Sequence, residues 1–260
     1  MIRFTDVTKT YGDLTVLGPV SGEIRAGGVT SLVGANGAGK STLLTIVGRL
    51  LTPTSGHVEV GGLDVATASR RDLARTLAIL RQENHLTARL RVEELVTFGR
   101  FPHTGGRITR EDREHVERAL EFLDLLPLRD RFLDQLSGGQ RQRAFVAMTI
   151  AQDTAYLLLD EPLNNLDLAH AATMMRFVRR AADELGKTVV MVVHDINVAA
   201  AYSDRIIALR GGRIVADGGR PEIMTPHTLA DVFGLHMDVH EIGGDVVAMH
   251  HTGVPLSTVA

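Results

Sequence analysis

A glycine-rich loop near the N-terminus has the residue types of a phosphate site. Its residues match the spacing G-x-x-x-x-G-K-[ST] and are Gly34, Ala35, Asn36, Gly37, Ala38, Gly39, Lys40, Ser41 and Thr42. Glycines let the backbone curl so that successive N–H groups face phosphate oxygens, and a following helix adds the positive end of its dipole. Lys40 would reach the β- and γ-phosphates, and the Ser41 hydroxyl would bind Mg²⁺. The loop predicts nucleotide binding rather than a plain strand-to-helix turn.

Two carboxylates follow an apolar run later in the chain. Residues 156–159 are apolar and of strand length, and Asp160 and Glu161 come directly after them. Ligands bind at the ends of parallel strands, so Asp160 is placed to hold Mg²⁺ directly or through water. Glu161 can deprotonate a water for in-line attack on the γ-phosphorus. A solvated strand end is the alternative, and the phosphate loop in the same chain favours the catalytic interpretation.

A second pair of glycines lies at a predicted helix start. Leu136, Ser137, Gly138, Gly139 and Gln140 precede a helix that we expect over residues 141–151. Ser137 has the residue type of an N-cap, and the two glycines leave N–H donors exposed, which makes a second anion site. One nucleotide cannot occupy both loops, whereas two copies of the chain facing each other would resolve the conflict.

The elements around these residues alternate between strands and helices. Antiparallel strands are expected within residues 1–30, and buried strands over residues 29–33, 156–159 and 189–193. Helices are expected over residues 41–51, 110–126 and 168–185, and across most of residues 84–150. Ser69 with Asp72 and Thr109 with Asp112 have the spacing of helix N-caps. The order predicts an α/β protein with a helical insert and right-handed crossovers.

The last part of the chain predicts a hairpin. Residues 237–242 and 245–250 flank Gly243 and Gly244, which suit a tight turn. His236, His240, His250 and His251 could converge across it as metal ligands. The alternative is that they are solvent-facing strand residues, which we favour because no second shell of partners is evident.

Composition excludes several classes of function. The 260 residues carry a formal net charge of −3, which opposes general nucleic-acid binding. There is no cysteine, which excludes disulfides, thiolate metal sites and a cysteine nucleophile. No apolar run reaches the ~18 residues of a membrane span, and the N-terminus lacks the apolar stretch of a signal peptide.

Taken in order, these motifs resemble the ATPase subunits of ABC transporters over essentially the whole chain. The resemblance rests on the phosphate loop, Gln82 after a strand, Leu-Ser-Gly-Gly-Gln at 136–140, Asp160-Glu161 and His194 after a strand. It implies a P-loop NTPase with a RecA-like mixed sheet core, an antiparallel β lobe and a helical insert. It implies one ABC ATPase domain over residues 1–260, with the RecA-like core and the β lobe in 1–83 and 152–235, a helical signature subdomain in 84–151 and a C-terminal β tail in 236–260.

The same resemblance assigns roles to single residues. Tyr11 resembles the aromatic residue that stacks on adenine, and Gln82 the glutamine that contacts Mg²⁺ and the attacking water. Ser137 and Gly139, with Gly138 and Gln140 beside them, resemble the residues that bind the γ-phosphate of ATP held by the other subunit. Asp167 resembles the acidic residue of the loop at the dimer interface, and His194 the histidine that hydrogen-bonds the γ-phosphate.

Finer features are similar to importer ATPases for ferric siderophores, and related cobalamin and haem importers share much of them. The similar segments are 97–103, 162–170 and 194–200. Leu163 stands where Thr is usual, and Asn164-Asn165 replace small residues. The resemblance implies ATP and Mg²⁺ as cofactors, a homodimer, two integral-membrane permease subunits and an indirect link to a substrate-binding protein. It places the protein peripherally at the cytoplasmic face of the membrane, without nucleic acid.

Other interpretations remain open at this point. A DNA-associated ATPase or a non-transport switch would use the same fold, although a non-hydrolysing switch would be expected to lose Glu161 or His194. Asn164-Asn165-Leu166-Asp167 superficially resembles a guanine-reading motif, but it lacks the lysine and follows the Asp-Glu strand too closely. Tyr11 could be a surface strand residue, Gln82 an ordinary polar residue and His194 part of a helix cap.

Overall fold

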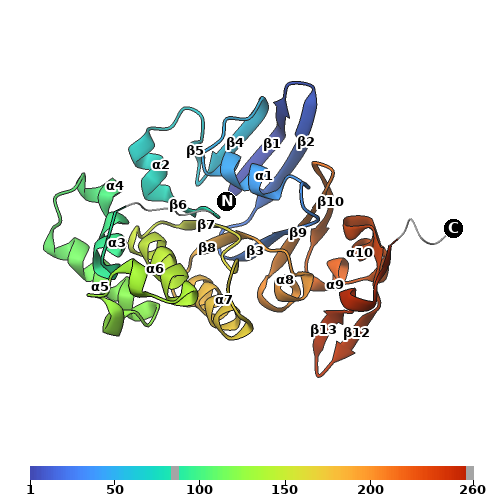
Figure 1. The fold of residues 1–260 in the computed structure, drawn as a ribbon. Helices are drawn as coiled ribbons and strands as arrows, with labels where there is room; N and C mark the ends of the chain where they lie inside the picture. Colours follow the sequence, from blue (N-terminus) through green and yellow to red (C-terminus); the bar gives the residue numbers. More distant parts are fainter. Residues whose placement is uncertain (83–87, 256–260) are drawn as a thin grey trace. The chain divides into compact units, whose positions relative to one another are not determined.

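The computed structural model describes residues 1–82 and 88–255, and the chain divides into two units (Figure 1). Unit 1 comprises Met1–Ala66 with Val190–Ala260, and unit 2 comprises Thr67–Val189. The predicted boundary between residues 83 and 84 and the last five residues of the predicted tail lie outside the described residues.

Unit 1 contains a four-stranded antiparallel sheet. Its order is β2-β1-β4-β5, with the bounds β1 Ile2–Tyr11, β2 Leu14–Ile24, β4 Ser55–Val60 and β5 Leu63–Asp64. The register of β1 on β2 runs from Ile2 opposite Ile24 to Tyr11 opposite Leu14. Apolar side chains of β1 alternate into the core, with Ile2 and Phe4 buried, which is the period of a half-covered sheet. The predicted antiparallel strands are confirmed.

Unit 1 also carries a mixed three-stranded ladder that leads into the phosphate loop. Strand β3 (Gly28–Val33) pairs parallel with β9 (Arg205–Arg210), which pairs antiparallel with β10 (Arg213–Gly218). Residues 29–33 are buried, as expected for a strand covered on both faces. The chain leaves β3 through the loop and enters α1 (Lys40–Val47). This is the predicted order of strand, loop and helix.

The C-terminal part of unit 1 packs on this ladder through small elements. They are α8 Ile196–Tyr202, α9 Arg220–Ile223, α10 Pro226–Phe233, β11 Leu235–His236, β12 Val239–Ile242, β13 Asp245–Ala248 and β14 Val254–Pro255. Val33, Ile206, Leu229 and Met237 share one apolar core with Ala248. Strands β12 and β13 form the predicted hairpin, which Figure 1 shows in red beside α9 and α10.

The hairpin is fixed by its turn and by one side chain. Gly243 and Gly244 have φ values of 63° and 90°, which the two-residue hairpin turn requires and glycine adopts without strain. The side chain of Asn197 donates to the carbonyl of Ala248 at 3.1 Å and accepts from its N–H at 2.7 Å. These two bonds tie β13 to α8.

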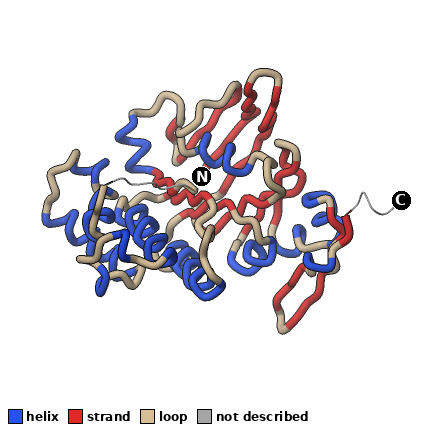
Figure 2. The backbone as a smooth tube through the Cα atoms, viewed as in Figure 1, coloured by secondary structure: helices blue, strands red, loops and turns tan. Residues whose placement is uncertain are grey.

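Unit 2 is mainly helical, and Figure 2 shows its clustered helices in blue. Its parallel strands β6 and β7 pair with Leu77 opposite Tyr156. Its elements are α2 Arg70–Thr76, β6 Leu77–Leu80, α3 Val92–Phe98, α4 Phe101–Thr104, α5 Arg110–Phe122, α6 Gly138–Ala151, β7 Tyr156–Asp160 and α7 Leu168–Asp183, with short 3₁₀ turns at Leu126–Leu128 and Leu133–Gln135. Strand β8 (Thr188–Val192) crosses the division between the units.

The starts of the helices agree with the sequence predictions more closely than their ends do. The Ser69 and Thr109 hydroxyls accept from the N–H groups of Asp72 and Asp112, as predicted. Helix α1 ends at Val47 rather than near residue 51, and α5 ends at Phe122 rather than at 126. In each case a later residue takes a left-handed conformation, and a backbone N–H then bonds a carbonyl five residues back, at Leu50 and Leu125.

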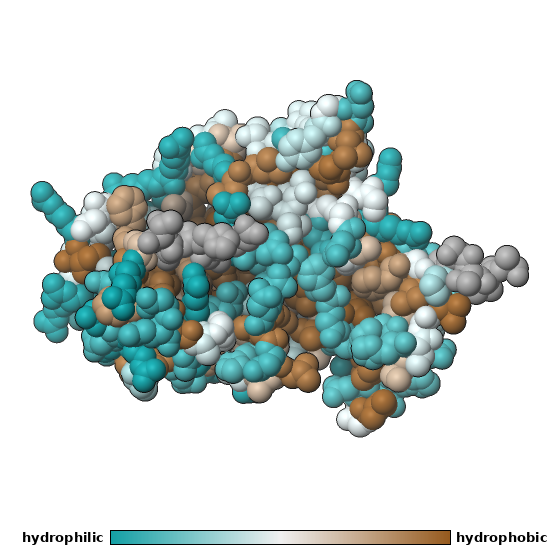
Figure 3. Space-filling view, viewed as in Figure 1, coloured by the Kyte–Doolittle hydropathy of each residue, from teal (hydrophilic) through white to brown (hydrophobic). Residues whose placement is uncertain are grey.

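Hydrophilic residues cover most of the face seen in Figure 3, with apolar groups in small separate areas. One such area lies at the tip of the β12–β13 hairpin, where Ile242 is 61% exposed. Across residues 1–82 and 88–255, every helix is too short or too polar to cross a membrane.

Candidate functional site

The phosphate loop has the backbone that a cradle needs. Gly34, Gly37 and Gly39 have φ values of 140°, 76° and 98°, in the region that favours glycine. A Cβ on Gly34 would overlap the carbonyl oxygen of Leu209, so the loop start sits directly on β9. Gly39 is the N-cap of α1 and makes no side-chain cap, so no side chain of its own covers the N-terminal end of the helix.

Lys40 holds the loop from within. Its side chain is buried, and Nζ donates to the carbonyls of Gly34 at 2.8 Å and Ala35 at 3.0 Å. Residues 35–37 form an exposed rim. A buried ammonium beside the N-terminal end of a helix makes a positive site, so the cradle fits the phosphates of a nucleotide.

The carboxylates lie at the end of β7 in unit 2. Asp160 is buried as the last strand residue, and Glu161 follows with a φ of 50°. A left-handed glutamate is uncommon, and such strain gathers at functional sites. Asp160 is the last residue of the strand, and Glu161 starts the following turn, in which the N–H of Asn164 donates to the Glu161 carbonyl at 3.2 Å.

Gln82 and Glu161 are in contact. Nε2 of Gln82 donates to Oε2 of Glu161 at 2.7 Å, although 79 residues separate them. Parallel pairing of β6 with β7 explains the approach, because both residues follow the same ends of neighbouring strands. A third residue joins them, since Nδ2 of Asn164 donates to the same oxygen at 2.6 Å. Asn164 was not predicted as a site residue, and only its departure from the family pattern marked it.

The residues proposed for Mg²⁺ have suitable chemistry. Ser41, Gln82 and Asp160 offer a hydroxyl, an amide and a carboxylate, the hard oxygen ligands that Mg²⁺ takes. Ser41 is half-buried in the first turn of α1, in unit 1, whereas Gln82 and Asp160 belong to unit 2. The donor set fits the ion.

The second glycine loop starts α6 with a complete cap. Oγ of Ser137 accepts from the N–H of Gln140 at 3.3 Å, and Oε1 of Gln140 accepts from the N–H of Ser137 at 3.1 Å. This capping box confirms Ser137 as the N-cap and starts the helix at Gly138. Ser137 and Gly138 are exposed, whereas Gly139 is buried. A ligand that binds at this helix start would therefore approach the exposed residues Ser137 and Gly138 from outside the loop.

Asp167 is connected to that helix start by a residue the sequence did not single out. Asp167 is the N-cap of α7, and its Oδ1 lies 2.8 Å from both the backbone nitrogen and the ring Nδ1 of His170. These hydrogen bonds lower the pKa of the Asp167 carboxyl below its ordinary value. The His170 ring packs on Gly139, where a Cβ would overlap it. No sequence signal links His170 to Gly139, because the contact depends on the turn between β7 and α7.

Tyr11 ends β1 with its side chain 55% exposed. Nζ of Lys9 lies 4.9 Å from the centre of the Tyr11 ring and donates to the carbonyl of Thr52 at 2.9 Å. The ring is thus held at the surface as a flat aromatic platform, which suits base stacking.

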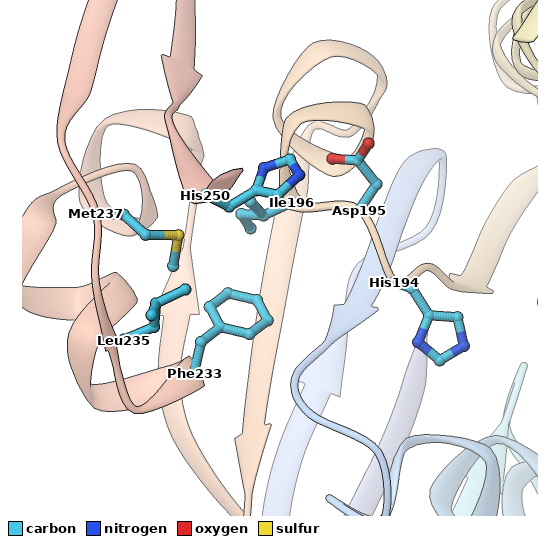
Figure 4. Close-up of a pocket in the computed structure, with 7 residues that line it drawn as sticks. All are labelled: His194, Asp195, Ile196, Phe233, Leu235, Met237 and His250. Carbon is cyan, nitrogen blue, oxygen red and sulfur yellow. The ribbon is translucent and has the colours of Figure 1, made fainter. Parts of the chain in front are cut away.

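His194 precedes α8 without capping it. The cap is Asp195, whose side chain accepts from the N–H of Asn197 at 2.8 Å. His194 is one of the residues that line a cavity of about 340 Å³ in unit 1, and Figure 4 shows its ring turned away from Phe233 and Leu235, which line the same cavity. His194 is exposed although it contributes to the lining of this cavity.

The C-terminal histidines lie on different elements: His236 ends β11, His240 lies in β12, and His250 and His251 lie in a 3₁₀ turn, His250–Thr252. His250 stacks near His251, with ring centres 3.9 Å apart. Within residues 1–82 and 88–255, no group of three or more metal-binding side chains converges. His236 and His240 are exposed strand residues, as in the alternative, whereas His250 is half-buried and lines the cavity beside Phe233.

Three comparisons relate the chain to known proteins. The ABC transporter family matches residues 17–164. The petrobactin import ATP-binding protein FatE of Bacillus anthracis is 51% identical over 239 residues, 92% of this chain and 96% of that protein. The ferric enterobactin transport ATP-binding protein FepC of Escherichia coli (strain K12) is 39% identical over 261 residues, 100% of this chain and 95% of that protein. The dimeric structure of MJ0796, a bacterial ABC transporter cassette, is 32% identical with a TM-score of 0.76, covering 85% of this chain and 99% of that one.

Proposed function

This chain belongs to the ABC transporter family, and from that premise we propose that it binds and hydrolyses ATP to energise import of a ferric siderophore through a membrane permease. The observation that carries the proposal is the similarity to import ATP-binding proteins along nearly the full length of both chains. The Asp-Glu pair, Gln82 and His194 are all present, as hydrolysis requires.

Each site residue then has a chemical task. The loop from Gly34 to Thr42 binds the phosphates, with Lys40 on the β- and γ-phosphates and Tyr11 on the base. Mg²⁺, held by Ser41 and Asp160 with Gln82, would neutralise charge on the phosphate oxygens. Glu161 takes a proton from the attacking water as its oxygen bonds to the γ-phosphorus, and ADP leaves with its terminal oxygen charged. His194 hydrogen-bonds the γ-phosphate.

The active form is a head-to-tail homodimer. Ser137 with Gly138, Gly139 and Gln140 binds the γ-phosphate of ATP held by the second copy, and Asp167 lies at the interface. Support comes from the exposed and fully capped start of α6, and from the dimeric form of MJ0796. Closure on two ATP molecules supplies the difference in affinity between open and closed states that drives a conformational cycle.

Two permease subunits would receive this cycle through unit 2. Phe98 and Phe101 are 53% and 61% exposed at the junction of α3 and α4, and such aromatic residues are typical interface anchors. Between them, buried Arg100 donates to the carbonyl of Ala151 at 2.9 Å, at the far end of α6. Binding at this segment would be transmitted along α6 to Ser137. The protein would then lie peripherally at the cytoplasmic face, with the substrate-binding protein acting only through the permease.

The test is uptake of radioactive iron by bacteria that express this chain with its cognate permease and binding protein. Ferric petrobactin and ferric enterobactin are the first cargoes to compare, since the similar proteins carry those names. We expect uptake of a ferric chelate with the wild-type chain and loss with Glu161→Gln. Equal uptake with both chains, or uptake of cobalamin or haem alone, would contradict the proposal.

A further inference from the structure

The Glu161 carboxylate is held by two side-chain amides. Its Oε2 accepts from Nε2 of Gln82 at 2.7 Å and from Nδ2 of Asn164 at 2.6 Å. Hydrogen bonds to an ionised acceptor are shorter and stronger than those between neutral groups. A glutamate side chain has several rotatable bonds, so two donors on one oxygen restrict the orientations that the carboxylate samples.

The two amide donors belong to different parts of the chain relative to Glu161. Gln82 follows a separate strand, so its bond depends on the position of another chain segment. Asn164 is three residues after Glu161, and its backbone N–H donates to the Glu161 carbonyl at 3.2 Å. Asn164 therefore sits in one turn with Glu161 and moves with it. A displacement of Gln82 breaks the first bond and leaves the second intact.

The backbone makes this second bond important. Glu161 has a φ of 50° immediately after β7, so the side chain leaves the strand end in a direction that the strand itself does not fix. We propose that Asn164 is a positioning residue for hydrolysis, whose amide keeps the Glu161 carboxylate oriented while Gln82 serves the nucleotide. The inference rests on the proposed ATPase function, in which Gln82 and Glu161 act on the same water.

Steady-state ATP hydrolysis by three variants tests it. Asn164→Ala should lower kcat about tenfold, equivalent to about 1.4 kcal/mol, and leave KM for ATP within about twofold of wild type. Asn164→Asp keeps the size, removes the N–H donor and adds a charge beside Glu161, so its kcat should fall at least as far. Asn164→Gln keeps an amide and should recover part of the rate. A merely structural role would change KM and stability together and would not separate Asp from Gln.

A measurement without turnover separates this inference from the proposed function. Unfolding of the nucleotide-free protein in denaturant is compared for wild type, Asn164→Ala, Glu161→Ala, which removes the acceptor oxygen, and the double variant. We expect the two substitutions to be non-additive, because each removes one partner of the same bond. Additive effects would overturn the role of Asn164 whether or not the chain hydrolyses ATP. Wild-type kcat in both Asn164→Ala and Asn164→Asp, with Glu161→Gln inactive, would also overturn it while leaving the ATPase proposal standing.

Discussion

Two glycine-rich helix starts in this chain are built in opposite ways. Helix α1 begins after Gly39 in a left-handed conformation, without a side-chain cap, and its Lys40 is buried. Helix α6 begins after Ser137 with a complete capping box, and Ser137 and Gly138 are exposed. Both could bind an anion, because both present a helix N-terminus. Only α1 has a loop of its own that surrounds the space at the helix N-terminus.

This difference indicates which of the two helix starts can bind a nucleotide without a second copy of the chain. In the α1 loop, glycines take the positive φ values that turn the backbone around a phosphate-sized space, with the buried Lys40 beside it. At the start of α6, the side chains of Ser137 and Gln140 accept hydrogen bonds from backbone N–H groups. This helix start is therefore stable without a ligand. We interpret α1 as the primary site and α6 as the half that a second copy completes.

The largest expected effect comes from the buried lysine. Lys40→Ala removes the ammonium between the loop carbonyls and the phosphates, and should lower ATP hydrolysis by about 100- to 1,000-fold. ATP binding by the separate chain should weaken as well, measured by calorimetry. Unchanged ATP affinity would show that the primary site lies elsewhere, and it would contradict the difference drawn between the starts of α1 and α6.

Stability of the α6 start depends on which glycine is changed. Gly139→Ala should destabilise the protein by about 1–3 kcal/mol, because the Cβ overlaps the His170 ring. Gly138→Ala should stay within about 0.5 kcal/mol, since its nearest neighbour is the Asn165 carbonyl oxygen at 3.7 Å. Denaturant unfolding measures both variants. Equal losses would show that His170 does not support this helix start.

The far end of α6 gives a pH-dependent prediction. Burial alone would raise the pKa of Asp112, but hydrogen bonds from Thr109 and Arg100 hold it at about 2, below the ordinary 3.8. Arg100 and Asp112 form an ion pair of 2.9 Å, each side chain 5% exposed. A lowered pKa contributes stability above pH 3.8, here about 2 kcal/mol, which is lost as pH falls towards 2.

Unfolding free energy measured between pH 5 and pH 2 checks this loss. The Asp112→Asn variant should show a smaller decline over the same range, because the titrating group is absent. If wild type and variant decline in parallel, the Arg100–Asp112 pair does not fix the end of α6 that carries the Ala151 carbonyl.

A smaller effect is expected at the cap of α6. Ser137→Ala removes one hydroxyl, and should lower kcat about tenfold while ATP binding to the separate chain stays unchanged. Loss of the cap should also cost about 1 kcal/mol of stability. Ser137→Thr keeps the hydroxyl and is the matched control. A loss of ATP affinity in the separate chain would place Ser137 in the primary site instead.

Local signals in the sequence predicted much of this arrangement. Ser69, Thr109 and Ser137 cap helices as their spacing indicates, and Gly243-Gly244 turn a hairpin as expected. These features depend on neighbouring residues, so a single sequence reveals them. The predicted ends of α1 and α5 were wrong. The C-cap of α1 is Gly48 and that of α5 is Leu123, and the next residues, Arg49 and Asp124, are left-handed without being glycines.

Residues that act through distant contacts were harder to identify. Asn164 and His170 show no motif of their own, and their importance depends on reaching Glu161 and Gly139. Gln82 was found only through resemblance to a family, and the structure places it beside Glu161. Side-chain contacts across a turn or between strands follow from three-dimensional packing, which sequence spacing does not specify.

The central claim is that one ATP site combines the α1 loop of one copy with the α6 start of another. A mixture of Lys40→Ala and Ser137→Ala chains, each also carrying Glu161→Gln to prevent hydrolysis, tests it directly. Each variant alone lacks an intact site, whereas a mixed dimer contains one intact site. We predict that mixing restores dimers that retain trapped ATP, measured by size-exclusion chromatography with labelled nucleotide. No recovery on mixing, when Glu161→Gln alone traps ATP in a dimer, would contradict the shared site.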